Sequence, residues 1–246
     1  MATEKASFID QKVDRQVEQK VGSSTEAVED YAKAIYKFQQ REDGPVANST
    51  LVEVLRVSPG AVTAMLKRMD EMGLVSHAPY KGATLTPAGE RLAIEVIRHH
   101  RLLEAYLSEA LGMPWDKIHD EAEVLEHYIS EDLEELIAAS LGHPSHDPHG
   151  DPIPNSELEL AEQATRALSQ LDPGDAAIFV RVSDADPEML RYLGDREIAP
   201  GDRLEVIERQ PFGGPLSVRF GAGEFAIGGR LADAMRVLIV DAERQR

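Results

Sequence analysis

The segment between His119 and His127 contains the residues with the clearest capacity for chemistry. In a helix, positions 119, 123, 126 and 127 share one face, which would carry two imidazoles and two carboxylates. The residues concerned are His119, Glu123, Glu126 and His127. Carboxylates gathered on a face that should turn toward a core are costly unless a cation lies among them. The segment therefore indicates a divalent metal site.

A second group of possible ligands lies upstream. His100 and Glu104 form an i, i+4 pair in an otherwise apolar helical pattern. Together with the first group they supply enough nitrogen and oxygen donors for two divalent ions per subunit. The chain has no cysteine, so a site must be built from carboxylate, imidazole, carbonyl, thioether and water. We therefore interpret the chain as a metal-sensing protein.

Other interpretations of these residues stay open. A single histidine on an apolar face is usually a hydrogen-bonded core residue, and an acidic run is usually a solvated helix face. Two metals bridged by carboxylates can also drive hydrolysis, but no nucleophile, general base or phosphate-binding glycine loop accompanies them, so we expect no enzyme. His143, His146 and His149 lie among prolines in a loop, and we assign them no ligand role.

Length and charge limit the class of protein. A chain of 246 residues, 42% of them hydrophobic, is long enough for two domains. It has no apolar run near the roughly 20 residues of a membrane span and no signal-peptide pattern, so we expect a cytoplasmic protein without a membrane partner. The net charge of −18 opposes nucleic-acid binding. However, residues 101–140 carry a net −9 and residues 30–100 a net +1, so the acid concentrates around the candidate metal ligands.

Three helices are expected in the N-terminal part of the chain. Their expected ranges are 23–40, 48–55 and 59–73. Asn48 suits the N-cap of the second helix, and Ser58 followed by Pro59 is a strong start signal for the third. The apolar residues of the third helix that we expect to face inward are Ala61, Val62, Met65, Leu66 and Met69.

A β-hairpin should follow the third helix. The β-prone runs 74–77 and 83–86 flank Tyr80-Lys81-Gly82, which has the composition of a turn. Two short helices joined by residues 56–57 and followed by such a hairpin predict a winged helix-turn-helix.

This motif indicates a DNA-binding surface, with protein contacts as the alternative use. Small residues at the start of the third helix could enter the major groove; they are Ser58, Pro59, Gly60, Ala61 and Thr63. Residues that could contact the phosphate backbone are Asn48, Ser49, Lys67, Arg68 and Lys81.

The remainder of the chain should contain helices and then strands. We expect helices over residues 87–112, 115–127 and 130–141, a proline-rich linker or belt loop over 143–154, and a short helix over 157–171. Five β-rich runs follow, at residues 177–182, 203–208, 216–220, 224–227 and 235–240. Five short strands in about 70 residues predict a small all-β barrel.

The order of these features resembles the diphtheria toxin repressor family of metal-dependent transcriptional repressors, over roughly residues 24–240. The resemblance is carried by the winged helix, His-Arg-Leu-Leu-Glu at 100–104, His-Asp-Glu-Ala-Glu at 119–123, Glu-His at 126–127 and Gly-Asp-Pro-Ile-Pro at 150–154. It implies a mainly α fold with a winged helix-turn-helix, a helical dimerisation domain and a C-terminal SH3-like barrel of the FeoA type. The implied domains are a flexible N-terminal arm (1–22), the DNA-binding domain (23–95), the dimerisation and metal-binding domain (96–142), a linker (143–173) and the SH3-like domain (174–246).

The resemblance also implies the ligands of two metal sites. In iron-responsive members the primary site uses a Met from the first helix and a Cys from the dimerisation domain, with a Glu-His pair. The matching residues here are Asp30, Glu123, Glu126 and His127. Both sulfur positions are carboxylates, as in the manganese transport regulators, and such hard ligands suit Mn²⁺.

The ancillary site of the longer members matches His100, Glu104 and His119, with Asp184 as the nearest candidate from the β module. Where manganese regulators place a further carboxylate one turn after Asp30, this chain has Lys33, so we expect two separated sites.

The function implied is that of a Mn²⁺-activated homodimeric repressor that binds palindromic operators in double-stranded DNA at metal-uptake or homeostasis genes. The metal would bridge the DNA-binding and dimerisation domains. Fe²⁺, Co²⁺ and Zn²⁺ are alternative metals. The alternative functions are an iron-dependent or broad divalent-metal regulator, a metal-binding scaffold without DNA affinity, and a metallohydrolase.

Overall fold

The computed structural model describes residues 25–42, 44–78, 81–161, 163–184 and 186–240. The chain forms two compact units, Met1–Ile97 and Arg98–Arg246, which are described separately. The N-terminal arm expected over residues 1–22 and Tyr80 of the expected turn lie outside the described residues.

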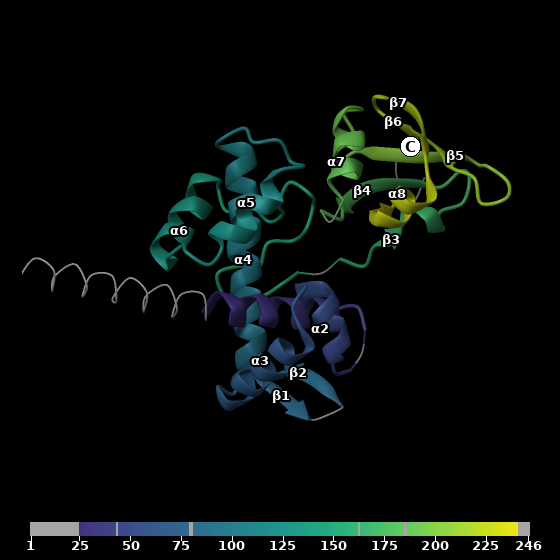
Figure 1. The fold of residues 1–246 in the computed structure, drawn as a ribbon. Helices are drawn as coiled ribbons and strands as arrows, with labels where there is room; N and C mark the ends of the chain where they lie inside the picture. Colours follow the sequence, from purple (N-terminus) through teal and green to yellow (C-terminus); the bar gives the residue numbers. More distant parts are fainter. Residues whose placement is uncertain (1–24, 43, 79–80, 162, 185, 241–246) are drawn as a thin grey trace, which may run out of the picture. The chain divides into compact units, whose positions relative to one another are not determined.

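The N-terminal unit is the winged helix-turn-helix that the sequence predicts. Its elements are the helix of residues 25–39, α2 (Asn48–Leu55), α3 (Pro59–Glu71), β1 (Val75–Ala78), β2 (Gly82–Leu85) and the first part of α4 (Pro87–Glu109) (Figure 1). The two strands pair antiparallel, with Val75 opposite Leu85. Val46 adds a backbone bridge to Ala83, which ties the segment before α2 to the wing.

Capping chemistry explains where α3 begins. The Ser58 hydroxyl accepts a hydrogen bond from the Ala61 amide, and Pro59 occupies the first helical position, as predicted. Val62, Leu66 and Met69 are buried at helical spacing. Ala61 was wrongly predicted to face inward: it is exposed because it lies outside this i, i+4, i+7 stripe.

The predicted cap of α2 was wrong by one residue. Ala47 is the N-cap, without a side-chain hydrogen bond, and Asn48 is the first helical residue. The Ala47 carbonyl accepts hydrogen bonds from the Thr50 and Leu51 amides, so the backbone alone starts this helix.

The helical part of the C-terminal unit consists of the rest of α4 with α5 (Ile118–Leu125) and α6 (Glu131–Ser140). Figure 1 shows α5 and α6 beside this half of α4, and the three helices share one core. The Ser130 hydroxyl caps α6 by accepting a hydrogen bond from the Leu133 amide. The helix predicted over residues 115–127 is shorter, because residues 115–117 and 126–128 form turns.

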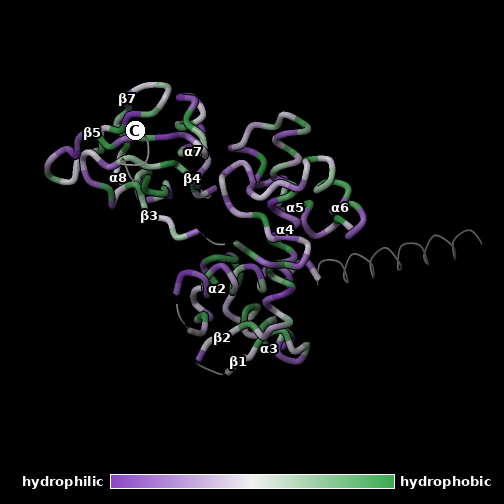
Figure 2. The backbone as a smooth tube through the Cα atoms, turned by 180° about the vertical axis from the view of Figure 1, so that it is seen from behind, coloured by the Kyte–Doolittle hydropathy of each residue, from purple (hydrophilic) through white to green (hydrophobic). Residues whose placement is uncertain are grey.

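The β module is a six-stranded antiparallel sheet in the order β3-β8-β4-β5-β6-β7. Its strands are β3 (Arg166–Ala167), β4 (Ala176–Val182), β5 (Arg203–Arg209), β6 (Leu216–Phe220), β7 (Gly223–Ile227) and β8 (Met235–Ile239). Buried and exposed residues alternate along much of β5 and β6. Figure 2 shows hydrophobic and hydrophilic stretches interspersed along the β module. All five predicted strands are present. In the described part of the chain no pairing joins β3 to β7, so the sheet is open rather than a closed barrel.

The helix predicted over residues 157–171 was wrong. This segment contains the short strand β3 and a 3₁₀ helix at Leu168–Gln170, because Arg166 and Ala167 pair with β8. Tertiary pairing here overrides the helical propensity of a Glu-, Ala- and Leu-rich run. Two helices of the module, α7 (Pro187–Gly194) and α8 (Gly229–Ala234), were not predicted.

The loop over residues 143–154 contains neither a helix nor a central strand, as expected, but it is closely packed. His146 and Pro152 form a backbone bridge, and the His149 carbonyl accepts a hydrogen bond from the Val182 amide of β4. None of the described helices is long and apolar enough to cross a membrane.

Replacement of Gly150 by Ala should destabilise the C-terminal unit. Gly150 has φ +88°, and a Cβ there would collide with the Val180 carbonyl, whereas Gly174 has φ +94° and open space around it. The left-handed backbone costs a non-glycine residue about 1–2 kcal/mol at either position, and the collision adds to this cost only at Gly150. Urea unfolding followed by the fluorescence of Trp115, the single tryptophan, measures both variants. Equal losses in Gly150→Ala and Gly174→Ala would contradict the expectation.

Candidate metal centre

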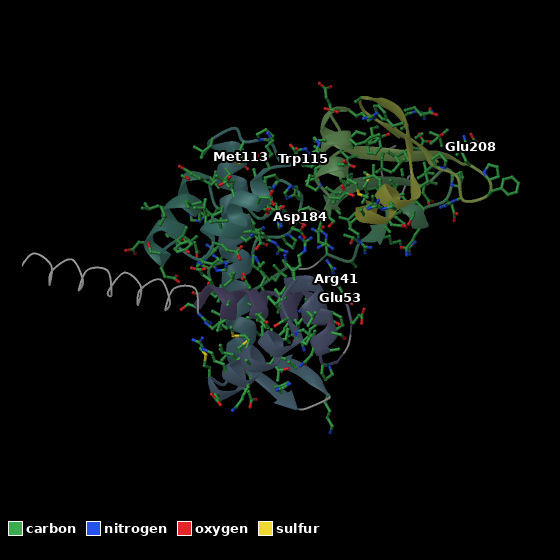
Figure 3. The ribbon with its side chains drawn as sticks, in the orientation of Figure 1. Arg41, Glu53, Met113, Trp115, Asp184 and Glu208 are labelled. Atoms are coloured by element: carbon green, nitrogen blue, oxygen red, sulfur yellow. The ribbon has the colours of Figure 1, made fainter. Side chains whose placement is uncertain are left out.

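Four of the chemically capable side chains converge in the C-terminal unit. His100 and Glu104 extend from α4, His119 from α5 and Asp184 from the segment after β4 (Figure 3 labels Asp184). Glu104 Oε1 lies 3.1 Å from His100 Nε2 and 3.4 Å from His119 Nδ1. His119 Nδ1 is also 3.0 Å from Asp184 Oδ2. One donor atom from each residue lies within 4.8 Å of the others, which is the spacing of a potential cation site.

The helices place these side chains by simple periodicity. His100 and Glu104 lie one turn apart on α4, so their side chains meet on the same face. On α5, Ile118 and Ala122 are buried in the helical core, which leaves His119 and Glu123 on the neighbouring face. Glu123 Oε1 lies 3.7 Å from His119 Nε2.

Glu126 brings a second carboxylate to the same histidine. Its side chain is 1% exposed, and its Oε2 lies 2.5 Å from His100 Nδ1. His127 Nε2 lies 3.6 Å from Glu126 Oε1. His100 therefore separates two acidic groups, with one ring nitrogen toward Glu104 and the other toward Glu126. His100, a ligand expected for the ancillary site, therefore contacts Glu126, a ligand expected for the primary site.

Asp30 belongs to the N-terminal unit. It lies half-buried on the helix of residues 25–39. Its association with Glu123, Glu126 and His127 stays a prediction.

The electrostatics of the cluster fit a bound cation. Burial raises the pKa of Glu104, but the neighbouring imidazoles of His100, His119 and His149 lower it more, so the pKa lies well below its usual value. Asp184, and then Glu104, raise the pKa of His119 to about 10. In the metal-free protein a proton on His119 thus supplies positive charge that a divalent ion would otherwise bring.

His149 is a member of this region that the sequence did not reveal. It is fully buried, and its Nε2 donates to the Trp115 carbonyl at 2.8 Å. Its Nδ1 is buried, has no hydrogen-bond partner among the residues that the structure describes, and lies 3.7 Å from Glu104 Oε2. Burial lowers the pKa of His149, but Glu104 and Asp147 raise it to about 9.

With Asp147, these residues form another donor set: one atom each from Glu104, Asp147 and His149 lies within 4.8 Å of the others. A buried nitrogen without a partner beside a carboxylate is the arrangement that a cation would complete. His143 and His146 are exposed. Glycine at position 150, with positive φ, was the one sequence signal of a tight turn that could turn His149 inward.

The candidate DNA contacts lie in the N-terminal unit. The residues at the start of α3, together with Ser49, Lys67, Arg68 and Lys81, are exposed, and Asn48 is half-buried. The Ser58 hydroxyl is engaged in capping, and the Thr63 hydroxyl donates to the Pro59 carbonyl at 3.0 Å. Lys67 forms a loose, solvent-exposed ion pair with Glu71 at 3.8 Å. Their roles in DNA binding stay predictions.

Comparison with known proteins gives a consistent result along the chain. Three family models match in order: the iron dependent repressor N-terminal DNA binding domain at residues 24–83, the iron dependent repressor metal binding and dimerisation domain at 86–155, and the FeoA domain at 166–238. The iron-dependent repressor IdeR of Mycobacterium leprae (strain TN) is 31% identical over 225 residues, which are 86% of this chain and 96% of that protein.

Solved structures agree with this result. A manganese-dependent transcriptional repressor in complex with manganese is 39% identical, with a TM-score of 0.81, and the match covers 87% of this chain and 100% of that one. The manganese regulator SloR is 30% identical, with a TM-score of 0.69, over 87% of this chain and 98% of that one.

Metal binding at the His119 cluster should release a proton. A ligating imidazole nitrogen must be deprotonated, and the pKa of His119 is raised to about 10, so below that pH the metal displaces a proton. The affinity for Mn²⁺ should therefore fall about tenfold for each pH unit below neutrality. Calorimetry in buffers of different ionisation enthalpy measures the protons released. His119→Gln should release about one proton fewer than the wild type, and His146→Gln, at an exposed loop position, should match the wild type. Equal release from all three proteins would contradict this assignment.

Proposed function

The chain belongs to the iron-dependent repressor family of metal-dependent transcriptional repressors, and from this premise we propose that it is a Mn²⁺-activated homodimeric repressor of metal-uptake or homeostasis genes. The observation that carries the proposal is the convergence of buried carboxylates on His100, in a chain whose first matched domain is a DNA-binding domain. The buried carboxylates of Glu104 and Glu126 require positive charge nearby, which makes this arrangement responsive to a cation.

The donor chemistry favours manganese. Carboxylates at Asp30 and Glu123, and the absence of cysteine, give ligand sets of oxygen and imidazole nitrogen alone. Mn²⁺ lies at the weak end of the divalent affinity series and gains least from sulfur ligands. The similarity to a manganese-dependent repressor supports this choice, while the similarity to IdeR supports Fe²⁺ as the alternative metal. Co²⁺ and Zn²⁺ suit the same donors.

We assign the ligands to two sites in each subunit. The primary site consists of Asp30, Glu123, Glu126 and His127, and the ancillary site consists of His100, Glu104, His119 and Asp184. His149 lies 3.7 Å from the second carboxylate oxygen of Glu104, and Asp147 forms a donor set with both residues, so we place these two side chains as an extension of the ancillary site. A bound divalent ion supplies two positive charges that offset these carboxylates.

Asp30 gives the primary site its regulatory role. It lies on the first helix of the DNA-binding domain, whereas the other three ligands lie on α5 and in the turn that follows it. Holding Asp30 with them fixes the start of that helix, and so the separation of the two α3 helices in a dimer. Without a cation, Asp30 and the other acids repel one another, and the looser arrangement is favoured. The metal thus shifts the population toward the DNA-binding form, because it binds that form more tightly than the looser one.

The dimer contact is proposed on the exposed apolar residues of α5, α6 and the turn between them. Large apolar side chains are exposed there; they are Val124 (61%), Leu125 (38%), Tyr128 (67%), Leu133 (45%) and Leu136 (66%). Such a concentration of exposed apolar residues is typical of an interaction surface. Two copies paired about a two-fold axis would present two α3 helices, which predicts a palindromic operator.

Operator binding should require metal, and the metal preference should change with one ligand. In Glu123→Cys the introduced thiolate favours softer metals, so Fe²⁺ or Zn²⁺ should replace Mn²⁺ as the best activator. Glu121→Cys is the matched control, because Glu121 is exposed on the same helix. Fluorescence anisotropy with operator DNA at fixed salt, titrated with each metal, measures the effect. Equal DNA affinity of the wild type in chelator and in Mn²⁺ would refute the co-repressor role.

A charge on the α5–α6 face should separate the dimer. Leu136→Glu places a carboxylate in the proposed contact, and we expect the dimer to weaken by at least tenfold, since burying an unpaired charge is costly. Leu111→Glu changes a leucine of similar exposure (62%) at the end of α4 and should leave the dimer intact. Sedimentation equilibrium with Mn²⁺ gives the dimer dissociation constant. A dimer unchanged by Leu136→Glu would locate the contact elsewhere.

A further inference from the structure

Next to His100, α4 carries two more buried cationic or basic side chains that the proposed metal sites do not use. Arg98 is 6% exposed and His99 is 8% exposed. Such groups are retained in an interior only where acceptors surround them. The Arg98 guanidinium donates to the Pro154 carbonyl at 2.5 Å, and its second partner is a carboxylate on α6.

That carboxylate is Glu134. Its Oε1 lies 2.5 Å from Arg98 Nε, and its Oε2 lies 2.8 Å from His99 Nε2. Burial raises the pKa of Glu134, but His99 and Arg98 lower it further, which keeps the carboxyl charged. Glu134 therefore holds two adjacent side chains of α4 to α6, one with each carboxylate oxygen.

The other nitrogen of His99 reaches the metal centre. His99 Nδ1 donates to the backbone carbonyl of Glu126 at 3.2 Å. Glu126 ends α5, and its carboxylate lies 2.5 Å from His100. Two consecutive histidines of α4 thus hold the same residue, His99 by its backbone and His100 by its side chain.

We propose that Glu134 is a positioning residue for the metal centre: through His99 it fixes the backbone at Glu126 and so aims the Glu126 carboxylate at the cation. This inference rests on the proposed function, in which Glu126 is a ligand. His99 can act on the ligand in this way because the Glu126 carbonyl and the Glu126 side chain belong to the same residue. A displacement of the carbonyl therefore moves the backbone from which the carboxylate extends.

The position of Glu134 on α6 gives the link a second consequence. Leu133 and Leu136, on either side of it in sequence, are exposed on the proposed dimer face. A shift of α6 on dimerisation would move Glu134, and with it His99 and Glu126. Metal affinity and dimer affinity should therefore depend on each other, and they must do so by the same factor in both directions.

The test uses the full-length protein and Mn²⁺ alone. Glu134→Gln keeps the size of the side chain but removes the charge that holds Arg98 and His99 together. Glu135→Gln is the matched control, because Glu135 is the exposed neighbour on the same helix. Calorimetric titration resolves the two sites, which are identified by the variants Glu123→Ala and Asp184→Ala. We expect Glu134→Gln to weaken the Glu123-dependent site about tenfold, leave the Asp184-dependent site within about twofold, and abolish the effect of Mn²⁺ on the dimer dissociation constant.

The outcomes separate this inference from the function on which it rests. A wild type that binds DNA equally with and without Mn²⁺ removes the proposed function. A wild type that requires Mn²⁺, with Glu134→Gln equal to Glu135→Gln at both sites, overturns only the positioning role. Equal weakening of both sites would also overturn it, because a general loss of structure acts on both. If Glu134→Gln lacks the wild-type circular dichroism spectrum, His99→Gln takes its place: selective weakening of the Glu123-dependent site supports the role, and unchanged affinity overturns it.

Discussion

Two buried carboxylates share one histidine in this protein. The helix α4 and the loop of residues 143–154 hold neighbouring side chains around this group. Glu104 and Glu126 are each 1% exposed, and His100 lies between them with a nitrogen toward each. One imidazolium cannot offset two carboxylates, and removal of two acids from water costs several kcal/mol for each ion. Further positive charge must offset this desolvation cost. His119 and His149 can supply it in the metal-free protein, and a divalent ion can supply it when bound. Binding of a divalent ion at this site would therefore be coupled to the free energy of unfolding.

The helix α4 organises this charge because its consecutive residues point to different neighbours. His100 and Glu104 face the metal centre, whereas Arg98 and Arg101 donate to the Pro154 and Pro152 carbonyls of the loop. The loop in turn supplies His149 to the metal centre and a carbonyl to β4. The helix α4 therefore carries ligands and holds the loop, and the loop in turn bonds to the β module.

Local chemistry made the helices and much of the candidate site predictable. Ser58 could be identified as a cap because its partner lies three residues away, and helical spacing alone placed His100 beside Glu104. The rest depends on contacts that spacing does not encode. Residues 157–171 have a helix-favouring composition, but part of the segment pairs with β8, a strand about 70 residues away. His149 is buried by packing against α4 and the Trp115 turn, and the proline-rich composition of its loop gives no sign of this.

The charge distribution explains why such a protein would need a dimer at all. The segment of residues 30–100 carries a net charge of only +1, so one copy offers little net positive charge to the phosphate backbone. Lys67, Arg68 and Lys81 can contribute a small number of contacts, and Lys67 is partly offset by Glu71. On the proposed function, a single domain would bind DNA weakly, whereas two domains held at the spacing of two half-sites would gain from their effective concentration. This gain in DNA affinity would disappear when the spacing of the two domains prevents them from contacting both half-sites at once. Control of the spacing by acids that need a cation would then regulate DNA binding more strongly than any change in the contacts themselves.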